Sequence, residues 1–333
     1  MSWLKAHDLD QLAAYDQWVQ SSPYGSFYQD RAWSKVKELW RSDYLLLKDD
    51  SGVVGGAAFR SINAANGKPF VYVSRGPVVD PNDVVTWRQV IDEARAYGEK
   101  IGAFFVRFDP LYPYSKTLEE SFTALGLHVR SVRETVWDKM TQTPLNAVMH
   151  LGGKDEEEIL AGLAGSKRRA IRNGMKNDPV FSTGRTEGHL LHFERMYQEM
   201  TDRKQIGRRP YDYFVRLMDA FPAAYFAEAS LDGAPICSHL MLPYGQTMTY
   251  LYGASTAAVD RACIPDALHW QQIVEAKKHG YCLYDFGSVF QLDVSCGLYR
   301  FKHGYCKQEG ITAYIGELDL VLDENAYAAF IGE

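Results

Sequence analysis

The feature that most constrains the fold is a pattern that occurs twice along the 333 residues. In the first half, strand-like runs precede a helix-like segment that carries Trp87 and a strand that ends at Asp109. In the second half, strand-like runs precede a helix-like segment that carries Trp270 and a strand that ends at Asp285. The apolar residues in these segments have helical or alternating spacing. The repeat predicts an α+β protein made of two copies of one unit, with a binding cleft between the copies.

The boundaries of these elements follow from the Gly, Pro and Asp residues that flank the apolar runs. The expected strands are 44–48, 53–60, 70–73 and 104–108 in the first half and 225–229, 234–242, 248–252 and 281–284 in the second. Helices are expected over 9–19, from 81 to about 98, over 187–204 and from 265 to 280, and residues 156–176 predict two helices or one bent helix.

Positive charge is concentrated in one segment of an acidic chain. The net charge of −6 argues against general nucleic-acid binding, DNA included, yet residues 166–176 contain five basic residues and no acidic one. Arg168, Arg172 and Lys176 are four residues apart, which places them on one face of a helix. A basic face on an acidic protein indicates one local polyanionic partner, and a solvated helix face is the alternative.

Cysteine usage and hydropathy favour a cytoplasmic protein. The five cysteines are odd in number, form no CxxC pair and have no zinc-ligand spacing with histidine, so reduced thiols and no metal are expected. The N-terminus lacks the apolar core of a signal peptide, and no apolar run is long enough to span a bilayer. We therefore expect no integral membrane segment, and a monomer is compatible with the composition.

The motifs of several common chemistries are absent. The chain has no GxGxxG after a strand, no GxxxxGK[ST], no HExxH and no GxSxG. The repeated unit is similar in layout to GNAT-type acetyltransferases, which normally bind the coenzyme A pyrophosphate on a Gly-rich loop before a helix. Residues 257–265, at the equivalent place, contain no glycine. An acetyl-CoA donor is therefore not expected, and neither is any cofactor. A GNAT-type N-acetyltransferase and a non-catalytic scaffold on the same fold stay as alternatives.

Eight segments carry a more specific resemblance, in the same order and with similar spacing. They are 22–37 (SPYGSFYQDRAWSKVK), 71–80 (VYVSRGPVVD), 106–110 (VRFDP), 207–214 (GRRPYDYF), 251–255 (LYGAS), 283–288 (LYDFGS), 299–305 (YRFKHGY) and 314–323 (YIGELDLVLD). Through these segments the sequence resembles the FemABX family of non-ribosomal peptidyltransferases over nearly its whole length. Such proteins have two GNAT-like domains, and larger members carry a long helical hairpin arm. The chain has no long charged helical insertion, so it resembles the members without that arm.

The resemblance implies an activity and a division of the chain. The activity is aminoacyl transfer from aminoacyl-tRNA to the side-chain amine of the third stem-peptide residue of a peptidoglycan precursor. The amino acid would be Ala, Ser or Gly, and the acceptor would be UDP-MurNAc-pentapeptide or lipid II. Residues 1–145 with 317–333 would form a first GNAT-like domain that binds the precursor. Residues 146–316 would form a second domain with the tRNA side and the catalytic lysine.

The resemblance also implies roles for three catalytic candidates. Lys302 would lie at the tRNA acceptor end and stabilise the oxyanion or the terminal phosphate, and Phe301 would stack on the terminal adenine. An exposed lysine on a loop is the alternative for Lys302. Asp109 is the candidate general base, or it orients the attacking amine. A simple turn before Pro110 is the alternative for Asp109.

The remaining candidates are binding residues. Lys37 and Arg209 match positions that hold the phosphates of the precursor, for which Arg is suited by its bidentate geometry. Tyr213 and Tyr252 match aromatic positions of the same site, with a core role as the alternative. Phe104 stands where a tyrosine is expected, so one hydroxyl contact to the substrate is in doubt. The tRNA phosphates would be held by Lys167, Arg168, Arg172 and Lys176.

Overall fold

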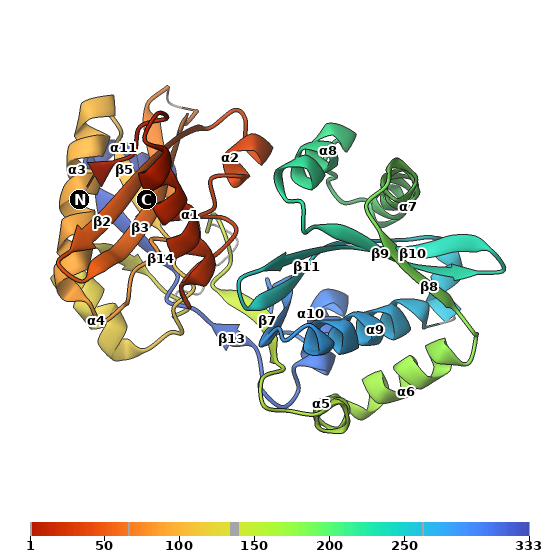
Figure 1. Cartoon of the computed structure of the whole chain (residues 1–333). Coiled ribbons are helices and arrows are strands. Elements are labelled where there is room, and N and C mark those ends of the chain that lie inside the picture. The colour runs from red at the N-terminus through yellow and green to blue at the C-terminus, as the bar shows by residue number, and fades with distance from the viewer. Residues whose placement is uncertain (1, 66, 134–139, 262, 333) are drawn as a thin grey trace. The chain divides into compact units, whose positions relative to one another are not determined.

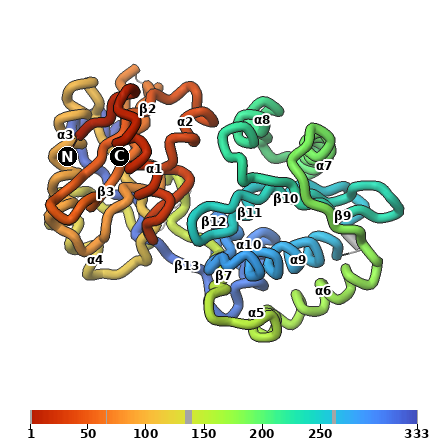
Figure 2. Tube along the Cα trace, viewed as in Figure 1, coloured from red at the N-terminus to blue at the C-terminus, as the bar shows by residue number. Residues whose placement is uncertain are grey.

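The computed structural model of the chain describes residues 2–65, 67–133, 140–261 and 263–332. The chain forms two compact units, and each is built on one seven-stranded mixed sheet. Unit 1 comprises Met1–Leu145 and Ala313–Glu333, and unit 2 comprises Asn146–Thr312. The boundaries between the units therefore lie after residues 145 and 312, whereas those predicted from the sequence lie after residues 145 and 316. The C-terminal tail of the chain lies among the elements of the N-terminal unit, as Figure 2 shows.

The sheet of unit 1 has the strand order β1-β2-β3-β4-β5-β14-β6. Its strands are β1 (Ser2–Trp3), β2 (Arg41–Asp49), β3 (Gly52–Asn63), β4 (Pro69–Val73), β5 (Phe105–Phe108), β14 (Glu317–Val321) and β6 (His128–Arg130). The pair β4–β5 is parallel, and the other neighbouring pairs are antiparallel. Its helices are α1 (Leu9–Ser21), α2 (Trp33–Val36), α3 (Val84–Ile101), α4 (Lys116–Ala124) and α11 (Glu324–Ile331).

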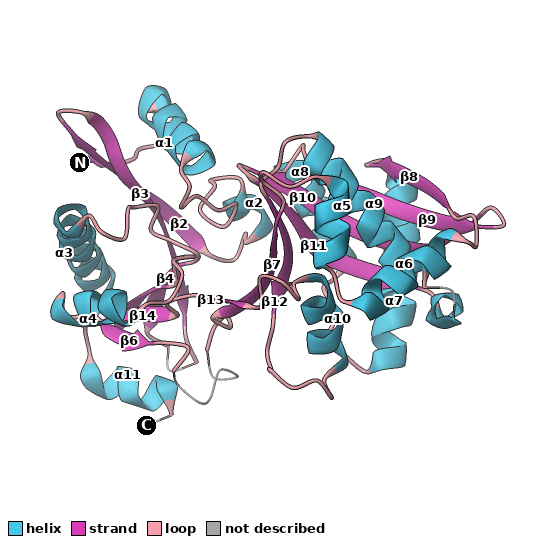
Figure 3. Cartoon of the chain, turned by 90° about the horizontal axis from the view of Figure 1, so that it is seen from below, coloured by secondary structure: helices cyan, strands magenta, loops and turns pink. Residues whose placement is uncertain are grey.

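The sheet of unit 2 has the strand order β8-β9-β10-β11-β12-β7-β13. Its strands are β7 (Leu145–His150), β8 (Val180–Gly184), β9 (Tyr225–Leu231), β10 (Ala234–Tyr244), β11 (Thr247–Ser255), β12 (Leu283–Ser288) and β13 (Thr312–Ala313). Its helices are α5 (Glu156–Gly162), α6 (Gly165–Met175), α7 (Glu187–Lys204), α8 (Tyr211–Ala220), the 3₁₀ helix η2 (Ala257–Arg261), α9 (Ile264–Lys278) and α10 (Gly297–Tyr305). Helices α7 and α8 cover one face of this sheet, and α6, α9 and α10 lie on the other face (Figures 1 and 3).

The two sheets correspond strand for strand, which confirms the predicted duplication. Each unit has a three-stranded antiparallel meander, a crossover helix and a strand parallel to the last meander strand. The crossover helices are α3 and α9. The next position in the sheet is filled by the tail strand β14 in unit 1 and by β7 in unit 2. The fold is therefore the predicted α+β pair of related units. The longest helices of the described residues, α3 and α7, have 18 residues each, so no long helical arm is present among them.

Local sequence explains where the crossover helices begin and end. In α3 the Asp83 side chain accepts a hydrogen bond from the Thr86 backbone, and Gly102 ends the helix in a left-handed conformation with φ of 71°. Trp87 is fully buried, and its ring lies 4.6 Å from that of Phe122. Helix α9 begins with Pro265 in its first turn. The predicted position of Gly98 near the end of α3 is confirmed, because Gly98 lies in the last turn of the helix, which ends at Ile101.

Buried ion pairs join the C-terminal tail to unit 1. The guanidinium of Arg107 on β5 donates to both oxygens of Asp319 on β14, at 2.8 and 2.6 Å. Arg130 on β6 donates to Glu317 at 2.7 Å. All four side chains are at most 7% exposed. Because these charges are paired within one layer, they fix the register of the tail strand. No helix of the described residues is both long and apolar enough to cross a membrane.

Candidate functional site

Lys302 is a buried lysine on helix α10. Its side chain is largely covered, with the residue 7% exposed, and its Nζ donates a hydrogen bond of 2.7 Å to the Ser288 carbonyl oxygen at the end of β12. Burial lowers the pKa of Lys302 to about 8, and the nearby Asp285 carboxylate opposes that effect. The alternative of an exposed loop lysine is therefore wrong. Strand β12 also continues to Ser288, past its predicted end.

The ring of Phe301 lies inside a cluster of aromatic and charged groups. The Lys167 Nζ lies 4.3 Å from the Phe301 ring centroid and 4.9 Å from that of Tyr305. The same Nζ donates to the Asp266 carboxylate at 2.7 Å, and the Tyr305 hydroxyl donates to the same oxygen at 2.7 Å. The His269 ring is 5.2 Å from the Phe301 ring. Lys167 therefore lies beside the catalytic candidate Phe301 and not among the exposed basic side chains of α6.

The four predicted tRNA-binding residues separate into three environments. Lys167 is ion-paired with Asp266. The guanidinium of Arg168 donates to the carbonyl oxygens of Ala161 and Leu163, at 2.8 and 2.5 Å, and so caps the end of α5. Arg172 and Lys176 are exposed on α6 and beside its C-terminal end. Arg169 is also exposed on α6, although it lies outside the four-residue spacing from which the basic helix face was predicted.

Asp109 follows β5 in unit 1 and is 2% exposed. Its carboxylate accepts hydrogen bonds from the Tyr72 hydroxyl, at 2.6 Å, and from the Arg75 backbone, at 2.5 Å. The Arg75 guanidinium lies 3.6 Å from the same carboxylate. Burial raises the pKa of Asp109, and the Arg75 charge and the Tyr72 hydroxyl act in the opposite direction. The arrangement suits a fixed anionic anchor better than a base that is open to a substrate.

Three of the five predicted precursor-binding residues form one cluster in unit 2. The Arg209 guanidinium lies 5.4 Å from the Tyr213 ring, and the Tyr252 hydroxyl donates to the Tyr213 hydroxyl at 3.2 Å. Arg209 is exposed, whereas Tyr213 is buried. This exposed guanidinium beside two tyrosines has the chemistry of a phosphate-binding surface.

The other two predicted precursor-binding residues belong to unit 1. The Nζ of Lys37, which follows α2, lies 5.9 Å from the Trp33 ring. Phe104 is 1% exposed and packs against Phe105 and Phe330, with ring centroids 4.8 and 5.5 Å apart. The burial of Phe104 argues against a contact with substrate.

Comparison with known proteins decides the family. The FemAB family model matches residues 11–232 and 223–331. The chain belongs to the FemAB family. It is 30% identical over 338 residues to the UDP-N-acetylmuramoylpentapeptide-lysine N(6)-alanyltransferase of Weissella viridescens, and the match covers 99% of both chains. It is 24% identical to the lipid II:glycine glycyltransferase of Staphylococcus haemolyticus, over 62% of this chain and 50% of that protein.

Solved structures agree with this FemAB-family fold. The crystal structure of FemX superposes with a TM-score of 0.87 at 18% identity, over 99% of this chain and all of that one. A tandem GNAT protein from the clavulanic acid biosynthesis pathway superposes with a TM-score of 0.55 at 10% identity, over 96% of this chain and 97% of that one. The duplicated GNAT-like architecture predicted from the sequence is therefore confirmed.

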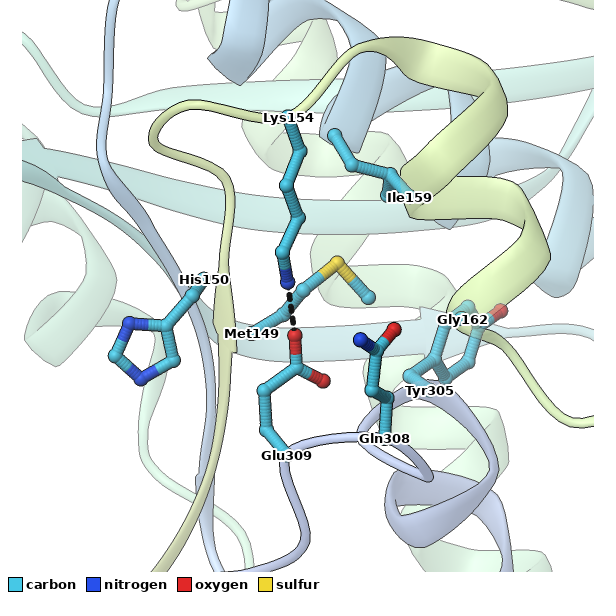
Figure 4. Close-up of a pocket in the computed structure, with 8 residues that line it drawn as sticks. All are labelled: Met149, His150, Lys154, Ile159, Gly162, Tyr305, Gln308 and Glu309. Atoms are coloured by element: carbon cyan, nitrogen blue, oxygen red, sulfur yellow. Dashed lines mark hydrogen bonds and ion pairs between the residues drawn. The ribbon is translucent and has the colours of Figure 1, made fainter.

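Two features of this FemAB-family chain lie outside the predicted site residues. His239 and His269 are buried in unit 2 with ring centroids 4.1 Å apart. Burial lowers the pKa of His239 to about 3 and that of His269 well below its usual range, so both rings are neutral at pH 7. The second feature is a small pocket beyond α10 that is crossed by an ion pair between Lys154 and Glu309 (Figure 4).

Neither feature gives an obvious cofactor site. Within the described residues, no group of three or more His, Cys, Asp or Glu side chains is arranged to hold a metal ion. The segment 257–265 forms η2 and the start of α9, and its residue 262 lies outside the described residues.

Proposed function

We propose that the chain is a tRNA-dependent aminoacyltransferase that acts on a peptidoglycan precursor. It moves alanine, or else serine or glycine, to the side-chain amine of residue 3 of the stem peptide in UDP-MurNAc-pentapeptide or lipid II. The product would begin an interpeptide bridge. The observation that carries the proposal is the full-length similarity to an alanyltransferase named for a lysine acceptor. That similarity favours alanine as the donor residue, lysine as the acceptor residue and the soluble precursor. These substrates place the reaction in the cytoplasm.

The proposed reaction is aminolysis of an ester. The uncharged amine of the acceptor attacks the aminoacyl carbonyl carbon, a C–N bond forms, and the C–O bond to the tRNA ribose breaks. The amine nitrogen loses one proton, and the departing ribose oxygen gains one. The ester is already activated, so the balanced reaction requires no nucleotide hydrolysis. Alignment of the two substrates can supply much of the rate, since effective molarities of order 10⁵ M are attainable.

Lys302 has the properties of the group that stabilises the oxyanion or the acceptor-end phosphate. An ammonium group has three N–H donors, and the Ser288 carbonyl accepts one of them. A pKa of about 8 leaves the group mostly protonated at pH 7. A cation in a low-dielectric site acts strongly on a negative charge that develops beside it. Phe301, the preceding residue, supplies a ring on which a terminal adenine can stack.

We assign the tRNA to unit 2 and contacts with the precursor to one residue of each unit. Unit 2 takes the tRNA, with Lys302 at the acceptor end and Arg172 and Lys176 on the backbone phosphates. Lys37 of unit 1 and Arg209 of unit 2 take the phosphates of the precursor. Asp109 acts by holding Arg75, because its carboxylate oxygens already accept hydrogen bonds from Tyr72 and Arg75.

The test is a reconstituted transfer assay. The protein is incubated with labelled Ala-, Ser- or Gly-tRNA and lysine-containing UDP-MurNAc-pentapeptide or lipid II, and products are identified by mass spectrometry. We expect one alanine in amide linkage to the ε-amine, and no product when acetyl-CoA replaces the aminoacyl-tRNA. Absence of any product from both acceptors, with a correctly folded protein and intact aminoacyl-tRNA, would overturn the proposal.

A further inference from the structure

The side chain of Lys167 faces the interior of unit 2 although it lies in the most basic segment of the chain. It is 13% exposed, and its Nζ lies 2.7 Å from the Asp266 carboxylate, whose side chain is 16% exposed. Its charge is therefore compensated inside the protein. A side chain that contacts tRNA phosphate needs exposure and a net positive charge, so Lys167 does not have the properties of such a contact.

The aliphatic stem of Lys167 packs directly on helix α10. A Cβ atom at Gly304 would lie 2.8 Å from the Lys167 Cγ and 3.0 Å from its Cε, so this contact requires glycine at position 304. The Gly304 carbonyl also accepts a hydrogen bond of 2.9 Å from the Ala164 backbone at the start of α6. The stem and the backbone together join α6 to the helix that bears Lys302.

The head group of Lys167 joins the same helix to α9. Its ammonium contacts the rings of Phe301 and Tyr305 on α10, and it pairs with Asp266 in the first turn of α9. Tyr305 donates to Asp266 as well. A partly desolvated ammonium is attracted by the negative face of an aromatic ring, so these contacts hold the rings and the head group together. Lys167 thus connects three helices at the turn that carries Phe301 and Lys302.

We infer that Lys167 is a positioning residue for aminoacyl transfer, which fixes the Phe301 ring and the α10 turn that directs the Lys302 ammonium. The inference rests on the proposed function for the identity of the reaction. Lys167 touches no reacting atom in this assignment. Lys167 affects the rate through the position of Lys302, because misplacement of a catalytic group by about 1 Å can lower a rate by about a hundredfold.

The first test measures the reaction with Lys167→Met, which keeps most of the aliphatic stem and removes the charge. We expect the single-turnover rate with both substrates bound to fall about tenfold to a hundredfold. We expect the KM for aminoacyl-tRNA and its salt dependence to stay unchanged, and Lys167→Arg to recover part of the rate. The control is Lys278→Met, which removes an exposed, ion-paired lysine from the end of α9 and should change nothing.

Two results, one kinetic and one on thermal stability, would overturn the inference. A higher KM at an unchanged maximal rate, with a log–log salt slope smaller by about one, would make Lys167 a phosphate contact. A lower melting temperature, with an unchanged rate per folded molecule, would make its role structural only.

The second test does not depend on the reaction. Acylation of lysines across a pH series, read by mass spectrometry, reports the pKa of the Lys302 amine. We expect half-maximal reactivity near the pH of about 8 in the wild-type protein and at clearly higher pH in Lys167→Met, because a loosened α10 exposes Lys302 to water. An identical Lys302 profile in the two proteins would overturn the inference even if transfer is active. A shifted profile without any transfer activity would place the failure in the proposed function.

Discussion

The parallel strand pair of each unit ends in a different way. In unit 1 the pairing of β4 with β5 ends at Val73 and Phe108, and the next residue, Asp109, then accepts a hydrogen bond from the Arg75 backbone. In unit 2 the pairing of β11 with β12 ends at Thr249 and Asp285, and β12 continues to Ser288. There the carbonyl of Ser288 accepts a hydrogen bond from Lys302. Equivalent ends of the two sheets thus hold an anion paired with a guanidinium and a cation whose hydrogen-bond acceptor is a neutral carbonyl oxygen.

The difference shows how a duplicated fold can divide its work. The Asp109 carboxylate has a guanidinium, a backbone N–H and a hydroxyl around it, so its charge is balanced by the protein. The Lys302 ammonium is hydrogen-bonded to a carbonyl, and burial lowers its pKa. A balanced buried charge anchors a structure, whereas a weakly balanced one can stabilise a charge that develops in a bound substrate. We therefore place the chemistry in unit 2 and an anchoring role in unit 1.

The largest expected effect is the loss of transfer in Lys302→Met. Removal of the ammonium should lower the single-turnover rate about 10²- to 10³-fold, in the range measured for the loss of one oxyanion donor. The melting temperature should hold or rise, because methionine fills a similar volume without a buried charge. The exposed Lys307, just after α10, gives the control Lys307→Met, which should be unaffected. A Lys302→Met enzyme with the wild-type rate would remove unit 2 from the chemistry.

The next effect is on stability and concerns the anchor in unit 1. Asp109→Asn leaves the buried Arg75 guanidinium without its carboxylate partner, so the free energy of unfolding should fall by about 3 to 5 kcal/mol. Chemical denaturation measures this, with Asp50→Asn in the exposed β2–β3 turn as the control. The rate per folded molecule should fall less than in Lys302→Met. If Asp109→Asn is as stable as the wild-type protein and its transfer rate falls as far as that of Lys302→Met, Asp109 is instead the general base.

A smaller effect is expected on the surface of unit 2 that we propose to bind tRNA. Charge reversal at Arg172 and Lys176 should raise the KM for aminoacyl-tRNA, because both side chains are exposed. The logarithm of the binding constant falls linearly with the logarithm of the salt concentration, and each lost phosphate contact should make this slope smaller by about one. Lys100→Glu, at an exposed lysine in the last turn of α3 in unit 1, is the matched control. An equal response to Lys100→Glu would show that the units do not differ in tRNA binding.

The sequence predicted the duplicated architecture well because short-range signals mark it. The Asp83 cap, the Pro265 helix start and the alternating apolar strands all act within a few residues. The position of β14 was predicted only through the family resemblance. No local signal indicates that Asp319 pairs with Arg107, which lies 212 residues away in the chain.

The candidate site was harder to predict in detail. Helix α10 was missed because glycines lie at both Gly297 and Gly304, although the second glycine is required by the Lys167 stem. The basic segment grouped Lys167 with Arg172, and only packing separates the partly buried lysine from the exposed arginine. The buried face of α9 includes Ile273, Val274 and the polar His269, while Trp270 on the same helix is only partly buried, so tertiary packing and not apolar spacing alone selects the buried side chains.

The pH dependence of single-turnover transfer tests the central claim, that the Lys302 ammonium supplies the catalytic charge. The rate should first rise with pH as the acceptor amine loses its proton, since a lysine amine ordinarily titrates at about pH 10. The rise should stop above a pH of about 8, because burial lowers the pKa of Lys302 and the loss of its cation then offsets the gain in neutral acceptor amine. In Lys302→Arg the rate should keep rising beyond a pH of about 8, because a guanidinium keeps its proton throughout that range. Residual transfer by Lys302→Arg that still levels off near that pH would contradict the account.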